Sequence, residues 1–146
     1  MGWGGAAAGL RQPVGWNYGA QTRRLVAFSL EGTASLPPQA PRGPVIPLDA
    51  PGFEVDPDLA AAGAALFRSC AACHGRVAKS AGMAPDLRAS AVVLDAGLFA
   101  DVVRGGQRSG RGMPQFPALT DEELLALRHY IRSVADQDLA STGGDR

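Results

Sequence analysis

Two cysteines and a histidine form the group of side chains whose types and spacing are best suited to chemistry, in the run Cys70-Ala71-Ala72-Cys73-His74. Two thiols at this spacing can add across the two vinyl groups of a haem, and the imidazole that follows at once can face the iron. A disulfide between the same cysteines would close a very short loop with poor geometry. The run therefore predicts one haem c, bound covalently through Cys70 and Cys73, with His74 as a ligand to the iron.

Three other uses of the two cysteines compete with this interpretation: a redox dithiol, half of a zinc site, or two buried bystanders. A zinc site requires further nitrogen or sulfur ligands, and His129 is the only other histidine or cysteine in the sequence. A thioredoxin-like dithiol would normally begin a helix that follows a strand, whereas this pair lies at the end of a predicted helix. We therefore favour haem over all three.

The iron needs a second axial ligand on the face opposite His74. Four side chains could supply it: Met1, Met83, Met113 and His129. Met83 follows His74 closely, so it would have to wrap tightly to reach the opposite face. Met113 comes after a predicted helix and a loop rich in glycine and arginine, between Gly112 and Pro114, which suit an extended segment laid across a flat ring. A lone methionine is ordinarily core filler, but in this context we expect Met113 to be the ligand.

Ligation by His74 and Met113 would favour one-electron chemistry. A thioether is a soft ligand that stabilises ferrous iron and raises the reduction potential. With both axial positions filled, no position remains for oxygen or a substrate. The predicted function is therefore single-electron transfer without enzymatic activity, because a haem-based gas sensor or a small peroxidase would need an open or labile position.

Three predicted helices must position these side chains. The first opens with Asp56 as N-cap and Pro57 at N1 and leads to the haem motif along one buried face. That face consists of Leu59, Gly63, Leu66, Phe67 and Cys70. The second helix begins at an Asp95 cap and stops at Gly105-Gly106. Its apolar residues are Leu98, Phe99, Val102 and Val103.

The third helix carries the clearest signals. Thr120 and Glu123 form a capping box, and acidic residues follow the cap, as the helix dipole favours. Its apolar stripe is Leu124, Leu127, Ile131 and Val134. The pattern predicts a helix that runs to about Ala135, with His129 on the surface because it falls outside the stripe.

The first third of the sequence has no helical period. Residues 24–30 alternate with a period of two and predict one strand, followed by a turn at Glu31-Gly32. Residues 37–47 contain five prolines, too many fixed φ angles for a helix or a central strand, and predict an extended linker. The composition changes near Pro51, where we place the boundary between the two parts. The predicted organisation is an irregular arm and linker over 1–53, a helical domain over 54–140 and a disordered tail over 141–146.

The overall composition excludes some classes of function. The 14 basic residues balance 14 acidic ones, so no strong positive field indicates nucleic-acid binding. No stretch reaches the roughly 18 apolar residues that a membrane span needs. The N-terminal residues lack the basic start of a signal peptide, so the sequence taken literally predicts neither a transmembrane segment nor an export signal.

The haem motif and the helices together resemble class I cytochrome c. Three further pairs of residues match that family: Gly63 with Phe67, Pro85 with Leu87, and Leu127 with Tyr130. The resemblance implies an all-α fold of three or four helices around the haem, with the first and last helices crossing at Gly63. It also implies that Pro85 and Leu87 belong to the haem site, and that the Pro85 carbonyl accepts a hydrogen bond from Nδ1–H of His74, which points Nε2 at the iron.

Longer runs narrow the resemblance to the C-terminal end of quinohaemoprotein alcohol dehydrogenases that depend on pyrroloquinoline quinone. These runs are Gly2–Gly5, Arg24–Phe28, Leu36–Pro38, Ala84–Arg88 and Arg111–Pro114. In that family a propeller domain with the quinone and calcium oxidises an alcohol, and a tethered cytochrome domain accepts the electrons. The resemblance implies that residues 1–53 include a remnant of the last propeller blade. It also implies that the chain is a fragment or truncated product without the catalytic propeller.

The same resemblance implies partners and a location. The electron donor would be a quinoprotein propeller domain, and the acceptor a small redox protein or a quinone. Because haem c is attached in an oxidising, export-linked compartment in most bacteria, the parent protein would be periplasmic. A free-standing periplasmic c-type cytochrome with an unrelated N-terminal tail is the alternative.

Arg104, Arg108 and Arg111 surround the loop before Met113. They could pair with the haem propionates or dock a partner, and Arg104 and Arg111 are the cofactor-binding candidates among them. The competing interpretation is a solvated loop, because surface ion pairs are individually weak.

Overall fold

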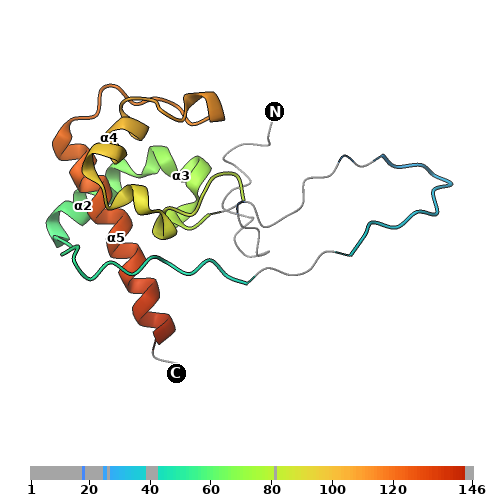
Figure 1. The fold of residues 1–146 in the computed structure, drawn as a ribbon, viewed down its shortest axis with the longest axis horizontal. Coiled ribbons are helices and arrows are strands. Elements are labelled where there is room, and N and C mark those ends of the chain that lie inside the picture. Colours follow the sequence, from blue (N-terminus) through green and yellow to red (C-terminus); the bar gives the residue numbers. More distant parts are fainter. Residues whose placement is uncertain (1–17, 19–24, 26, 39–42, 81, 144–146) are drawn as a thin grey trace.

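The computed structural model of the chain describes residues 18, 25, 27–38, 43–80 and 82–143. Within these ranges it is helical and contains no strand. The α-helices are α2 (Pro57–Leu66), α3 (Arg68–His74), α4 (Ala96–Val103) and α5 (Asp121–Gly143). Short 3₁₀ turns join them: η3 (Arg76–Ala78), η4 (Leu87–Ala89), η5 (Ala91–Val93) and η6 (Ser109–Arg111). The predicted all-α, class I cytochrome c-like fold is therefore confirmed, with α5 as its long central helix (Figure 1).

Helix α2 begins where the sequence predicts. The Asp56 carboxylate accepts hydrogen bonds from the backbone N–H groups of Asp58 (2.8 Å) and Leu59 (3.1 Å), and Pro57 occupies the first turn. These contacts satisfy donors that the start of a helix leaves without intrahelical partners. The N-terminal end of the helical part is thus fixed by residues adjacent in the sequence.

Helices α2 and α5 cross at Gly63, as the resemblance implied. A Cβ atom at Gly63 would lie 2.0 Å from the carbonyl oxygen of Ala126 and 2.8 Å from Cβ of Tyr130. Only glycine allows the two backbones to approach so closely. Next to the crossing, the rings of Phe67 and Tyr130 pack with their centroids 5.0 Å apart.

The predicted first helix is divided into two. Phe67 separates α2 from α3, and its carbonyl accepts hydrogen bonds from the N–H groups of both Cys70 and Ala71 at 2.9 Å. The haem motif fills the last part of α3, which ends at Gly75 with a φ of 78°. This positive φ favours glycine, and it turns the chain sharply after His74.

Helix α4 also begins at its predicted cap, where the Asp95 carboxylate accepts from the N–H of Leu98 at 2.8 Å. Of its predicted apolar residues, Phe99, Val102 and Val103 are buried. Arg104 is the C-cap, and Gly106 has a positive φ of 73°. The predicted stop at the glycine pair is therefore confirmed.

The capping box of α5 is present in both directions: Glu123 N–H donates to Thr120 Oγ1 (3.2 Å), and Thr120 N–H donates to the Glu123 carboxylate (2.8 Å). The predicted end near Ala135 is wrong, because α5 continues to Gly143. Residues 141–143, predicted as part of a disordered tail, are helical, and residues 144–146 lie outside the described ranges. Asp138 on this last stretch pairs with Arg88 at 2.7 Å, a contact between residues distant in the sequence that the helical period could not predict.

One core joins the helices and turns. Its buried members are Phe67, Ala78, Val93, Phe99, Val102, Val103, Leu124, Leu127 and Ile131. They come from α4, α5, η3, η5 and the junction of α2 and α3. Cys70 of α3 and Met113, which are partly buried, pack against this core.

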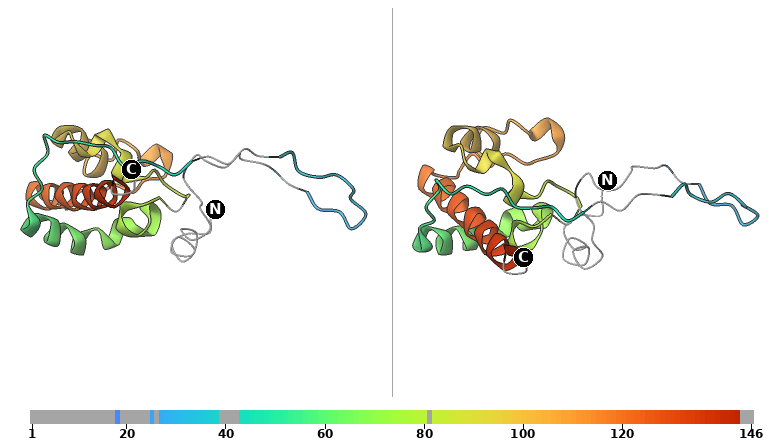
Figure 2. Two further views of the ribbon diagram at one scale, coloured as in Figure 1. Left: turned by 90° about the horizontal axis from the view of Figure 1, so that it is seen from below. Right: turned by 60° about the horizontal axis from the view of Figure 1, so that its bottom comes forward.

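The predicted strand over 24–30 is not formed in the described part of that segment, residues 25 and 27–30; Arg24 and Val26 lie outside the described residues. Leu25, Phe28 and Leu30 have relative exposures of 104%, 94% and 107%. Residues 27–38 project away from the helices (Figures 1 and 2). A lone strand cannot hold its shape without a neighbour to accept its backbone hydrogen bonds.

The chain meets the helical part before the predicted boundary near Pro51. Leu48 N–H donates to the Arg88 carbonyl at 2.9 Å, and Arg132 donates to the Leu48 carbonyl at 2.7 Å. Residues 43–53 consequently run across α5 (Figure 1). Segment 48–56, which we call the strap, is thus fastened to the helices at its start.

The strap is also fastened at its end, by a residue that was expected on the surface. His129 is buried, with a relative exposure of 9%. Its Nδ1 accepts a hydrogen bond from Asp56 N–H at 3.0 Å, and its ring lies 5.0 Å from that of Phe53. The prediction of an exposed His129 is wrong because the strap, which is far away in the sequence, covers that side of α5.

Candidate haem site

A single cavity of about 470 Å³ collects most of the predicted site residues. Its size falls within the range of about 300–1,000 Å³ that is typical of small-molecule sites. The predicted residues that line it are Cys70, Cys73, His74, Pro85, Leu87, Arg111 and Met113. The remaining wall is largely apolar and comes from the core, so the cavity is an extension of the hydrophobic interior rather than a polar cleft.

His74 is the last residue of α3 and is buried in the wall of this cavity. Its Nδ1–H donates to the carbonyl oxygen of Pro85 at 2.9 Å, which leaves Nε2 as the free ring nitrogen. Burial lowers the pKa of His74, while the Pro85 carbonyl and the charge of Asp86 act in the opposite direction. The imidazole is therefore held neutral and in the tautomer whose Nε2 lone pair can bind a metal.

Cys70 and Cys73 both line the cavity as free, half-buried thiols. Burial, and the neighbouring Cys73, raise the pKa of the Cys70 thiol. Cys70 therefore keeps its proton at neutral pH. A protonated Cys70 thiol beside an apolar cavity is poorly suited to redox exchange, which requires a stabilised thiolate.

Met83 and Met113 both line the cavity, so the structure brings both predicted sulfur donors to it. Met113 follows Gly112, which has a φ of 89°, and its N–H donates to the Arg108 carbonyl at 3.3 Å. Further on, Phe116 N–H donates to the Val103 carbonyl at 3.0 Å, which ties the segment to α4. The segment of Met113 is thus held against the side of the cavity that α4 forms.

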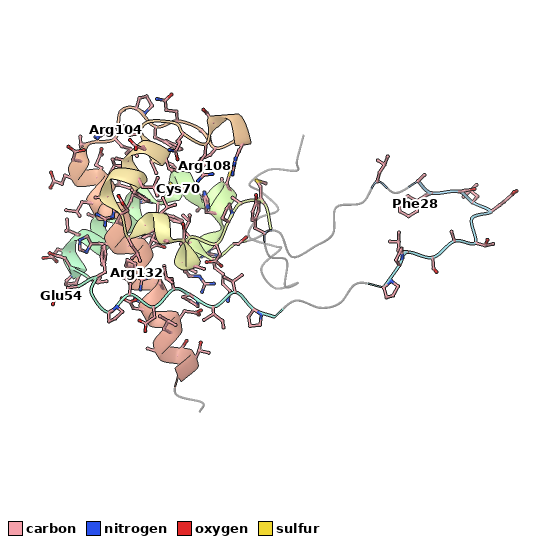
Figure 3. The ribbon with its side chains drawn as sticks, viewed as in Figure 1. Phe28, Glu54, Cys70, Arg104, Arg108 and Arg132 are labelled. Carbon is pink, nitrogen blue, oxygen red and sulfur yellow. The ribbon has the colours of Figure 1, made fainter. Side chains whose placement is uncertain are left out.

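The arginines of the loop differ in position, and Figure 3 shows two of them, Arg104 and Arg108. Arg108 and Arg111 line the cavity, and among the described residues neither side chain has an ion pair. Arg104 does not line the cavity and pairs with Asp121 at 2.7 Å. Arg108 is therefore closer to the site than Arg104, which the sequence had suggested as a cofactor-binding residue.

A buried ion pair beside His74 was missed by the sequence reasoning. The Arg88 side chain is almost completely buried and pairs with Asp86 at 2.8 Å and with Asp138 at 2.7 Å. Asp86 and Arg88 lie two residues apart directly after Pro85, and this spacing was a local signal for the pair that they form. Nothing in the sequence indicated the second, because Asp138 lies on the far end of α5.

The donor set of the cavity fits a haem. It offers two thiols, one oriented imidazole nitrogen and two thioether sulfurs, within an apolar wall. In the described ranges, no three His, Cys, Asp or Glu side chains gather into a group that could hold a metal by themselves. None of the helices in these ranges combines the length and hydropathy of a membrane-spanning helix.

Comparisons with known proteins find matches to the helical part of the chain and to most of its full length. Residues 58–131 match the family model described as cytochrome C oxidase, cbb3-type, subunit III. The chain is 32% identical over 137 residues to the dehydrogenase subunit of alcohol dehydrogenase (quinone) from Acetobacter aceti, covering 90% of this chain and 18% of that protein. It is 34% identical over 141 residues to quinohemoprotein alcohol dehydrogenase ADH IIB from Pseudomonas putida, covering 94% of this chain and 20% of that protein.

A shorter relative matches about half of the chain. Cytochrome c550 from Pseudomonas aeruginosa is 40% identical over 78 residues, or 48% of this chain and 51% of the relative. The chain spans about a fifth of the length of the two alcohol dehydrogenases. These findings confirm the resemblance to quinohaemoprotein alcohol dehydrogenases that the motifs predicted. The chain belongs to the cytochrome c oxidase, cbb3-type, subunit III family, and its helical part is a cytochrome c domain.

Proposed function

We propose that this chain binds one haem c covalently and carries single electrons through it, as an electron-transfer domain rather than an enzyme. The observation that carries the proposal is the convergence on one apolar cavity of two free thiols, an imidazole with its Nδ1 already engaged, and a methionine on the α4 side. When bound, haem supplies an iron that alternates between the ferrous and ferric states and so holds or releases one electron.

Each predicted site residue has a distinct task in this proposal. Cys70 and Cys73 would each add the thiol sulfur to one carbon of a vinyl group and the proton to the other, without net oxidation or reduction. His74 would donate Nε2 to the iron, and Met113 would donate its sulfur from the other face. With both residues bound to it, the iron would have no position left for a substrate, so the proposed chemistry is electron transfer rather than catalysis.

The apolar wall and the arginines would complete the site. Leu87 and Pro85 line the cavity with the core residues and would limit the access of water, so that little solvent rearranges when an electron arrives. Arg111 and Arg108, which have no ion pair among the described residues, would pair with the haem propionates. Arg104 would not, because Asp121 already pairs with it.

The names of the relatives suggest the partners. We propose a quinoprotein dehydrogenase domain as the electron donor, and a small redox protein or a quinone as the acceptor. Pyrroloquinoline quinone and calcium would belong to the donor. We infer a periplasmic location from the chemistry of haem c attachment and from the oxidising character of that compartment.

The test is to produce the chain together with a bacterial haem c maturation system. We expect a haem that stays attached after denaturation, and its loss in the Cys70→Ser, Cys73→Ser double variant. The reduced protein should resist carbon monoxide, because both axial positions are filled. A chain without attached haem would overturn the proposal, and rapid carbon monoxide binding would favour a gas sensor.

The axial ligand is tested by a matched pair of methionine variants. Met113→Ala should remove the weak near-infrared sulfur-to-iron band of the ferric protein and lower the reduction potential, because a soft ligand is lost. Met83→Ala is the control, since its side chain lines the same cavity, and it should leave both properties nearly unchanged. The opposite pattern would assign the ligand to Met83.

A further inference from the structure

The carbonyl group that orients His74 belongs to a loop held by a buried polar network. We propose that Asp86 and Arg88 are positioning residues for His74, which fix the Pro85 carbonyl and thereby set the reduction potential of the site. This inference rests on the proposed function, because it concerns the same imidazole. It adds two residues that do not touch the cavity: neither Asp86 nor Arg88 lines it.

The carboxylate of Asp86 is saturated with hydrogen bonds. Its Oδ1 accepts from the backbone N–H of Arg88 (3.2 Å) and from Arg88 Nε (2.9 Å). Its Oδ2 accepts from Arg88 Nη2 (2.8 Å) and from the backbone N–H of Ser80 (3.1 Å). Charge-assisted, two-pronged contacts of this kind fix orientation as well as distance. The residue that follows Pro85 is therefore held from both sides.

The residue that precedes Pro85 is held as well. Ser80 Oγ donates to the carbonyl of Ala84 at 2.7 Å and accepts from Gly82 N–H at 3.1 Å. Ser80 is itself buried. With Ala84 and Asp86 both tied to Ser80, the peptide groups that flank Pro85 cannot rotate independently. The Pro85 carbonyl, which accepts the hydrogen bond from His74 Nδ1–H, therefore has little freedom to move away from the imidazole.

Arg88 connects this loop to the rest of the domain. Its Nη1 donates to Asp138 on α5 at 2.7 Å, and its carbonyl accepts from Leu48 N–H of the strap at 2.9 Å. The acids and hydrogen bonds around it raise the pKa of Arg88 against the effect of burial, so it stays charged. Burying an ion pair costs desolvation energy and rarely adds stability over apolar residues. A pair retained beside the haem ligand is better explained by the geometry that it fixes.

The hydrogen bond from His74 to Pro85 connects the position of the Pro85 carbonyl with the reduction potential of the proposed haem. A histidine that donates Nδ1–H to a carbonyl is a more basic ligand through Nε2. A more basic ligand stabilises ferric over ferrous iron. If the carbonyl moves away, the imidazole becomes a poorer donor, so the reduction potential should rise and Nδ1–H should exchange with solvent more readily.

The experiment compares two charge-conserving substitutions in the haem-containing chain. Arg88→Lys keeps the positive charge but removes the fork that grips Asp86. Arg104→Lys is the matched control, because Arg104 also pairs with an aspartate at 2.7 Å, Asp121, yet lies outside the cavity. We expect Arg88→Lys to raise the potential and to speed deuterium exchange of His74 Nδ1–H about tenfold, while Arg104→Lys changes neither.

A second variant keeps the test decisive if Arg88→Lys unfolds. Ser80→Ala leaves every charge in place. It removes the hydroxyl that donates to the Ala84 carbonyl and accepts from the N–H groups of Tyr18 and Gly82, so a smaller rise in potential and faster exchange are expected. Equal potentials and exchange rates in the parent, Ser80→Ala and Arg104→Lys proteins would overturn the inference. Failure of the proposed function would appear earlier, in the unsubstituted chain, as missing haem or missing methionine ligation.

Discussion

The helical part of the chain and the segment 25–38 contain apolar side chains of the same kinds, but the helical part buries them and the segment leaves them exposed to solvent. Phe99 and Phe67 are buried beside the cavity, whereas Phe28 has a relative exposure of 94%. Figure 3 shows Phe28 on a segment far from the helices. Burial removes apolar surface from water only where a complementary surface exists. The strap, segment 48–56, has an irregular backbone like segment 25–38, yet it is fastened to the helices by hydrogen bonds at Leu48 and Asp56.

The largest expected difference between the two regions comes from a pair of phenylalanine substitutions in the haem-containing chain. Phe99→Ala should lower the free energy of unfolding by about 3–5 kcal/mol, because it leaves a hole in a packed core. Phe28→Ala should change it by less than about 0.5 kcal/mol, because an exposed side chain loses no burial. Denaturant titration measures both, and a similar cost for the two would show that segment 25–38 has a partner surface.

The next effect concerns the helix crossing. Gly63→Ala should cost about 1–3 kcal/mol or more, because its Cβ would lie 2.0 Å from the Ala126 carbonyl oxygen. Gly52→Ala is the matched control, since nothing lies within 4 Å of a Cβ at that position in the strap. Thermal unfolding of both variants tests the comparison. A Gly63→Ala protein as stable as the parent would mean that α2 and α5 do not need this close approach.

A smaller effect should appear with pH, through the contact between the strap and α5. Burial lowers the pKa of His129, Arg128 lowers it further and Asp56 opposes them. The unfolded chain therefore binds the proton more readily, and stability falls as pH drops below the unfolded value of about 6.5. Protonation of Nδ1 also removes the acceptor for Asp56 N–H. The loss of this hydrogen bond should lower the free energy of unfolding by about 1 kcal/mol. Stability curves at pH 8 and pH 5 measure this loss.

His129→Gln is the control for that loss, because it cannot titrate. Its unfolding free energy should depend less on pH between 8 and 5 than that of the parent. Equal dependence in both proteins would assign the effect to other groups.

The smallest expected effect is that of cutting the chain. Limited proteolysis should cleave within residues 27–38 and leave a resistant core that begins before Leu48, with the haem spectrum unchanged. The start differs from Pro51, where composition alone puts the boundary, because Leu48 is tied to Arg88 and Arg132. The free energy of unfolding should change by less than about 0.5 kcal/mol. Protection of residues 27–38 from cleavage would contradict this.

Interactions between residues close in the sequence made the helix starts, the haem motif and the buried helix faces predictable. The caps at Asp56, Asp95 and Thr120 were predictable because each satisfies backbone groups within a few residues. The thiols and the imidazole of the haem motif lie within five consecutive residues, so the sequence alone brings them together. The apolar periods of α4 and α5 likewise indicated which faces are buried.

Tertiary structure decided the contacts between residues that are distant in the sequence. The burial of His129 depends on Asp56 and Phe53 of the strap, and the extension of α5 is accompanied by the pairing of Asp138 with Arg88. Arg104 lies outside the cavity and pairs with Asp121. No local period encodes such pairings, because each forms only after the helices have packed. The sequence alone predicted His74 as an iron ligand, but only the packed fold revealed the buried pair of Asp86 and Arg88 next to the carbonyl that accepts its hydrogen bond.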